Sequence, residues 1–141
     1  MKSFIISLCF IATFAAADHL NMERLMASRE QCKAEFNIGP HYIEEYIVTH
    51  HEYPNDSFMP CYIQCVLQRM GVFDPYKGFD EQYLVNMLHE YGADEDVMKA
   101  HVHSCNDGNK LKTDTCLWAQ RFFECFLHKH PNLGKTILAM Q

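Results

Sequence analysis

The chain has 141 residues, of which 48% are hydrophobic and 21% charged, and its formal net charge is −6. The length suits one domain. The negative charge argues against nucleic acids and anionic membranes as partners.

The first residues predict export from the cell. An apolar run over residues 4–14 follows Lys2 and precedes the small residues 15–17, as at the cleavage site of a signal peptide. The run is shorter than the roughly 20 residues that span a membrane. We therefore expect residues 1–17 to be removed and residues 18–141 to form one secreted domain, with no stable membrane insertion.

The rest of the chain predicts helices separated by short polar turns. Asp80, Asp94 and either Thr113 or Asp114 stand where helix N-caps belong, and Pro40 suits a first helical turn. Apolar residues recur at helical spacing, whereas alternation typical of strands is hardly seen, so no strand is predicted. The predicted fold class is all-α, a compact bundle of six helices over residues 19–35, 40–50, 58–70, 81–91, 94–105 and 114–129.

Seven cysteines are present, and Cys9 lies in the segment expected to be removed, which leaves an even number for a disulfide framework. Cys61 and Cys65 lie one turn apart on one predicted helix, too far apart to bond each other. Cys116 and Cys125 lie on nearly opposite faces of another helix. Of the 15 pairings that six cysteines allow, these two exclusions leave ten.

The cysteine spacing resembles that of insect odorant-binding proteins. Three residues separate Cys61 from Cys65, eight separate Cys116 from Cys125, and the other intervals are long. The resemblance implies five or six helices stapled by three disulfides around an apolar cavity. It also implies the disulfide pairs Cys32–Cys65, Cys61–Cys116 and Cys105–Cys125.

The function implied by the resemblance is that of a secreted carrier. Such a protein binds small hydrophobic ligands, such as odorants, pheromones or fatty-acid-like molecules, and transports them through aqueous fluid to chemosensory receptors. No cofactor is expected, and the protein is expected to be a monomer or a homodimer. The alternatives are a secreted helical hormone and a non-sensory lipid carrier in saliva, haemolymph or reproductive fluid.

The candidate ligand-binding residues are apolar side chains that are large or flexible. Methionine is polarisable and adaptable, and aromatic rings offer wide flat surfaces. The resemblance also points to leucines of the helices that line the family's cavity. Two residues of the apolar C-terminal tail are expected to fold back over it. The candidates are Leu84, Met87, Leu88, Met98, Trp118, Phe122, Phe123, Phe126, Ile137 and Leu138.

Nine histidines raise the question of a metal site. Residues two apart on a helix, such as His101 and His103, do not face each other, and no cysteine is left to complete a tetrahedral set. No metal is therefore predicted. Because histidine changes charge near neutrality, His101, His128 and His130 are instead candidates for a pH-dependent trigger of ligand release.

No enzyme activity is predicted, because the chain has neither a G-x-S-x-G nor an H-E-x-x-H motif. The carboxylates of Glu44, Glu45 and residues 94–96 lie at helix starts, where they suit the macrodipole and are expected to be solvated. Asn55 opens an Asn-Asp-Ser sequon in a predicted loop over residues 51–57. It is a candidate for N-glycosylation in a secreted protein.

Overall fold

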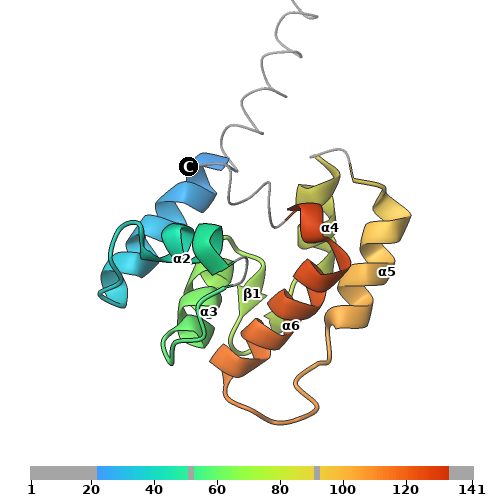
Figure 1. Ribbon diagram of the computed structural model, residues 1–141. Helices are drawn as coiled ribbons and strands as arrows, with labels where there is room; N and C mark the ends of the chain where they lie inside the picture. The colour runs from blue at the N-terminus through green and yellow to red at the C-terminus, as the bar shows by residue number, and fades with distance from the viewer. Residues whose placement is uncertain (1–21, 51–52, 91–92, 134–141) are drawn as a thin grey trace, which may run out of the picture.

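The computed structural model describes residues 22–50, 53–90 and 93–133 (Figure 1). Most of these residues are helical, which confirms the all-α fold class. The signal peptide and the start of the first predicted helix lie outside the described residues. The helices are residues 22–35, α2 (Tyr42–His50), α3 (Met59–Arg69), α4 (Glu81–His89), α5 (Glu95–Cys105) and α6 (Thr115–Lys129).

Carboxylate caps explain why three helices begin where they do. Asp80, Asp94 and Asp114 each accept a hydrogen bond from the backbone N–H three residues later, at 2.9, 2.9 and 3.1 Å. The predicted starts of α4, α5 and α6 are thereby confirmed, with Asp114 as the cap of α6. Residues 131–133, beyond the predicted end of the last helix at residue 129, are also helical, since proline at position 131 is tolerated in a first turn.

A short hairpin shows that the prediction of no strands was wrong. β1 (Phe73–Asp74) pairs antiparallel with β2 (Gly78–Phe79). Strands of two residues are too short to show the alternation from which strands are recognised. The carboxylate of Asp74 closes the turn, because it accepts hydrogen bonds from the backbone N–H groups of Tyr76 and Lys77, at 2.8 and 2.9 Å.

The hairpin packs against α6 through Trp118. The rings of Phe73 and Phe79 meet the indole edge to face, with centroids 5.3 and 5.9 Å away. Gly78 has φ +87°, and a Cβ there would lie 2.7 Å from the indole. Only glycine therefore fits this position.

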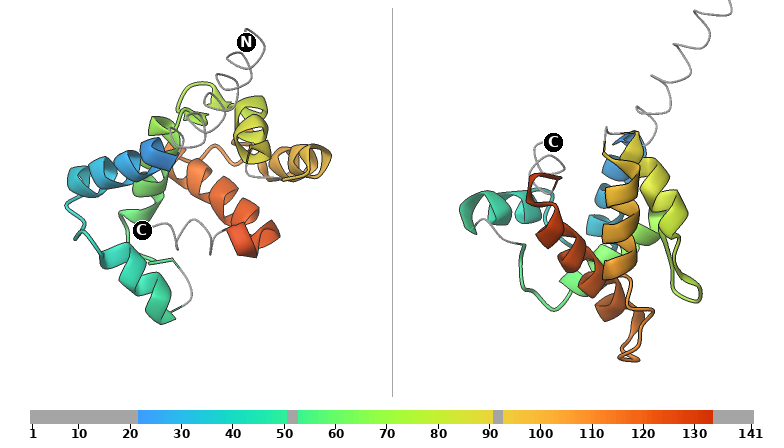
Figure 2. Two further views of the ribbon diagram at one scale, coloured as in Figure 1. Left: turned by 90° about the horizontal axis from the view of Figure 1, so that it is seen from above. Right: turned by 90° about the vertical axis from the view of Figure 1, so that its right-hand side faces the viewer.

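The described helices pack in two groups around α6. α6 contacts both α3 and α5, and α4 packs on α5, whereas α2 lies on the opposite side from α4 and α5 (Figures 1 and 2). One apolar cluster joins α4, α5 and α6, and a second joins the helix over residues 22–35 to α2 and α3. α3 and α6 contact each other where the two groups meet.

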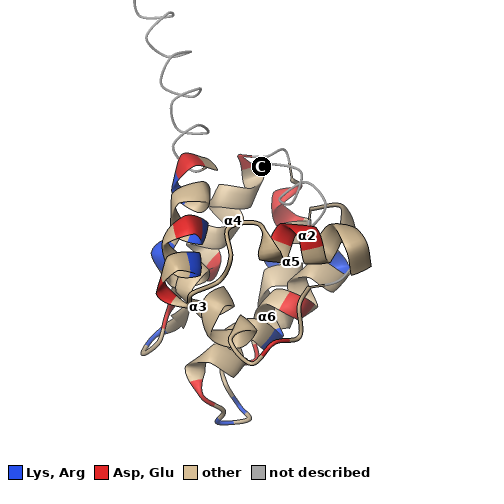
Figure 3. Cartoon of the chain, turned by 60° about the vertical axis from the view of Figure 1, so that its left-hand side comes forward, with Lys and Arg blue, Asp and Glu red and all other residues tan. Residues whose placement is uncertain are grey.

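Glu44 of α2 is buried, so the expectation of a solvated carboxylate was wrong at this position. Its Oε1 accepts hydrogen bonds from Arg29 and Lys33, the latter at 2.7 Å. All three side chains are less than a tenth exposed. The helical spacing of α2 could not reveal the two facing cations, which belong to another helix. Elsewhere, acidic and basic segments are spread over several helices (Figure 3).

Candidate functional site

A pocket of about 80 Å³ lies between α6, the start of α3 and the segment before α3. A single water-sized group needs roughly 10–15 Å³ of such space, so the pocket takes a short chain or one small ring. Most of its lining side chains are apolar. They are Tyr53, Pro54, Asn55, Met59, Ile63, Gln120, Phe123, Glu124 and Leu127.

Helical periodicity places the lining residues on one face of each helix. Met59 and Ile63 are one turn apart on α3, and they are 1% and 6% exposed, so they form the deep side of the pocket. The α6 residues stand at positions i, i+3, i+4 and i+7, which share a face. That face is mixed, because it carries two apolar and two polar side chains.

Tyr53 forms an aromatic corner of the pocket with Phe123. The two rings meet edge to face, with centroids 5.3 Å apart. Burial raises the pKa of Tyr53 to about 12, so its phenol stays neutral at physiological pH. The corner therefore offers flat apolar surface without adding a charge.

Polar groups stand at the solvent side of the pocket. Asn55 and Glu124 are exposed, and Gln120 is half-buried. The side-chain amide of Gln120 donates a hydrogen bond to Glu124 Oε1 at 2.9 Å. The pocket thus has a deep apolar side and an outer polar edge, which is the arrangement that a small amphiphilic molecule requires.

The structure divides the predicted ligand-binding residues among several places. Of those within the described residues, only Phe123 lines this pocket, and Trp118 packs against the hairpin. Ile137 and Leu138 lie outside the described residues. The remaining six belong to or pack against the cluster between α4, α5 and α6, and their contact with a ligand stays a prediction. They are Leu84, Met87, Leu88, Met98, Phe122 and Phe126.

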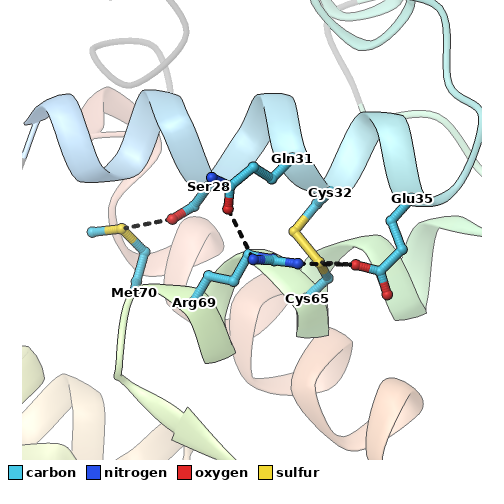
Figure 4. Close-up of a disulfide and its surroundings, with 7 residues drawn as sticks. All are labelled: Ser28, Gln31, Cys32, Glu35, Cys65, Arg69 and Met70. Atoms are coloured by element: carbon cyan, nitrogen blue, oxygen red, sulfur yellow. Dashed lines mark hydrogen bonds and ion pairs between the residues drawn. A yellow bond between two sulfur atoms is a disulfide. The ribbon is translucent and has the colours of Figure 1, made fainter.

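Three disulfides cross-link the helices, and each of them involves α3 or α6, the two helices that line the pocket. Cys32–Cys65 links the helix over residues 22–35 to α3 (Figure 4), Cys61–Cys116 links α3 to α6, and Cys105–Cys125 links α5 to α6. These are the pairs implied by the resemblance. Their Cα–Cα distances are 6.0, 4.5 and 5.6 Å, within the range that disulfides adopt. The bond between α3 and α6 fixes the spacing of the two helices that face each other across the pocket.

The first disulfide is flanked by polar contacts between the same two helices. Arg69 of α3 donates hydrogen bonds to Gln31 at 2.8 Å and to Glu35 at 3.2 Å (Figure 4). Ser28 contacts the sulfur of Met70 at 3.9 Å. The helix over residues 22–35 is thus held to α3 along several turns.

Two of the candidate histidines contact each other. Nδ1 of His101 lies 2.7 Å from Nε2 of His130, so one ring donates the proton and the other accepts it. Burial, the neighbouring His101 and Lys129 lower the pKa of His130. Protonating both rings would break the hydrogen bond between α5 and the end of α6. His128 is exposed.

Stability is expected to fall when the pH drops from about 7 to about 5. Because the pKa of His130 is lowered on folding, the unfolded chain takes up the proton first as the pH falls, which favours unfolding. His130→Gln should weaken this dependence, and His128→Gln at the exposed neighbour should leave it as in the wild type. Urea unfolding at both pH values measures the effect. Parallel pH dependences for the wild type and H130Q would refute the assignment.

Within the part of the chain that the structure describes, no three His, Cys, Asp or Glu side chains are grouped as metal ligands. None of the described helices combines the length and the hydropathy that crossing a bilayer demands.

These features define a class of protein, a small helical protein cross-linked by three disulfides with a largely apolar pocket between its helices. The model of the PBP/GOBP family matches residues 15–129. The chain belongs to this family, which confirms the resemblance found in the cysteine pattern.

Three relatives extend over nearly the whole chain. General odorant-binding protein 99a of Drosophila melanogaster is 32% identical over 133 residues, which cover 92% of each chain. Odorant-binding protein 22 of Aedes aegypti is 34% identical over 137 residues, 96% of each chain. General odorant-binding protein 99b of Drosophila melanogaster is 26% identical over 145 residues, 94% of this chain and 95% of the relative.

Proposed function

We propose that this protein binds small hydrophobic molecules in the pocket between α3 and α6 and carries them through extracellular fluid. The observation that carries the proposal is the pocket itself, whose apolar deep side ends at an exposed polar edge. The names of the relatives, which are odorant-binding proteins, support the same function. The family's relatives are named as binding proteins, and the proposal includes no catalytic step.

The wider parts of the proposal rest on the sequence. Cleavage after residue 17 would release residues 18–141 as a secreted domain. Delivery to a chemosensory receptor, the monomeric or homodimeric state and N-glycosylation of Asn55 stay predictions. Asn55 is exposed and lies in a non-helical segment, which suits a modification site.

Filling the pocket should abolish most of the binding. Leu127→Trp adds a large ring to the pocket wall, and we expect the dissociation constant of a fluorescent apolar probe to rise at least about tenfold. Leu117→Trp is the matched control, because Leu117 lies on the same helix and is 41% exposed. The L117W variant should bind the probe with the same affinity as the wild type. Fluorescence titration measures both variants, with melting curves to check that each is folded.

Two results would count against the proposal. Equal affinity for L127W and the wild type would remove this pocket as the binding site. If the wild type bound no apolar probe at all, the carrier function itself would fail and a secreted helical hormone would be favoured.

A further inference from the structure

We propose that the polar edge of the pocket selects ligands by their head group, favouring a cationic amine over a hydroxyl and disfavouring a carboxylate. This inference rests on the proposed carrier function and specifies the class of ligand. The group responsible is the carboxylate of Glu124, assisted by Gln120. The ligand would be a short amphiphile with its alkyl chain inside the pocket.

The depth of the lining residues sets the orientation of such a ligand. Met59 and Ile63 on the deep side are almost fully buried and offer no polar group to a ligand. Glu124 lines the same pocket and is exposed. An alkyl chain therefore gains most by entering toward α3, which leaves its head group beside α6.

The hydrogen bonds at the polar edge determine whether the head group of a ligand must donate or accept a hydrogen bond. Gln120 uses its N–H donor on Glu124 Oε1, which leaves the amide oxygen of Gln120 and the second carboxylate oxygen of Glu124 as acceptors. An ammonium or hydroxyl group can donate to such acceptors. A carboxylate ligand is an acceptor itself and meets like charge.

The charge of Glu124 has no basic partner in the part of the chain that the structure describes, since no Lys or Arg forms an ion pair with it there. The nearest arginine along α6, Arg121, is held by other partners. It donates to Asp107 Oδ2 at 2.8 Å and to Thr113 Oγ1 at 2.7 Å. The formal net charge of −6 adds to the disadvantage of an anion.

The test compares hexylamine, hexanol and hexanoate, which share one chain length and differ in the head group. Each ligand displaces a fluorescent apolar probe at about pH 8, where an ordinary imidazole is neutral and the amine is still protonated. We expect hexylamine to bind about fivefold more tightly than hexanol, as one contact between opposite charges near water allows, and hexanoate to bind most weakly. Raising the salt concentration should shrink the differences.

Glu124→Gln should bring the affinity for hexylamine down to that for hexanol and leave hexanol unchanged. The variant keeps a side chain that can accept from Gln120, and melting curves check that it is folded. Asp96→Asn is the matched control, since it removes one exposed carboxylate from α5, whose residues do not line the pocket. The D96N variant should still bind hexylamine more tightly than hexanol.

The outcomes separate this inference from the proposed function. If hexanol displaces the probe while hexylamine and hexanoate bind equally, or if E124Q keeps the preference of the wild type, the head-group selection is refuted and the carrier function stands. If none of the three ligands displaces a bound probe, the pocket is not the carrier site.

Discussion

Replacing Cys61 and Cys116 together by alanine should lower the free energy of unfolding by about 4 kcal/mol. Their disulfide has a sequence separation of 55, against 33 and 20 for the other two bonds, so its loss releases the most entropy in the unfolded chain. The same bond joins α3 to α6 across the pocket. Affinity for an apolar probe should therefore fall together with stability.

The control for this prediction is the double replacement of Cys105 and Cys125 by alanine. Their bond joins α5 to α6, closes the shortest loop and should cost about 3 kcal/mol. Probe affinity should stay unchanged under conditions where this variant is folded. Urea unfolding followed by circular dichroism measures both losses. Losses of less than about 1 kcal/mol in both variants would contradict the chain-entropy argument.

Helix starts were predictable from the sequence because their cause is local. Asp80, Asp94 and Asp114 each cap a helix through a hydrogen bond to a backbone group three residues away. The hairpin at residues 73–79 depends instead on packing against Trp118, which comes some forty residues later in the chain. No local pattern records such a contact, so the two strands were missed.

The pocket was only partly predictable for a similar reason. α6 carries large apolar residues on two adjoining faces, and sequence alone does not say which of the faces meets the core. Phe122 and Phe126 turn into the cluster with α4 and α5, whereas Phe123 and Leu127 turn to the pocket. The spacing of Phe123 and Leu127 by one turn was the available signal for the second face. Tyr53 lies in a loop, where residues follow no periodic pattern, so the sequence held no signal that this residue lines the pocket.

Glu44→Gln is expected to lower the free energy of unfolding by about 3 kcal/mol, because it leaves Arg29 buried without a counter-charge and Lys33 with only the exposed Glu30. The matched control is Glu30→Gln. Glu30 also pairs with Lys33, at 3.1 Å, but its side chain is 60% exposed, so the loss should stay below about 1 kcal/mol. Urea unfolding at neutral pH compares the two variants. Similar losses of stability in the two variants would show that burial of the carboxylate does not determine the cost of removing its charge.

Acid should reduce the difference in the free energy of unfolding between the wild type and E44Q. Burial alone would raise the pKa of Glu44, but the hydrogen bond from Lys33, together with the charges of Lys33 and Arg29, outweighs it and lowers the pKa. A carboxylate with a lowered pKa contributes stability above about pH 4.5, and this contribution is lost as the pH falls through the folded value. A difference that stays constant down to about pH 3 would refute the ionised state of Glu44.

A triple variant separates the attraction among these three charges from the cost of removing Glu44 while Arg29 and Lys33 stay buried. In R29M/K33M/E44L all three charges are replaced by apolar side chains of similar size, so no buried ion remains. Glu44 Oε2 is buried without a hydrogen-bond partner in the described residues, which already weakens the case for a net stabilising network. We therefore expect this variant to recover most of the stability that E44Q loses. If it is as unstable as E44Q, the ion pairs themselves hold α2 to the helix over residues 22–35.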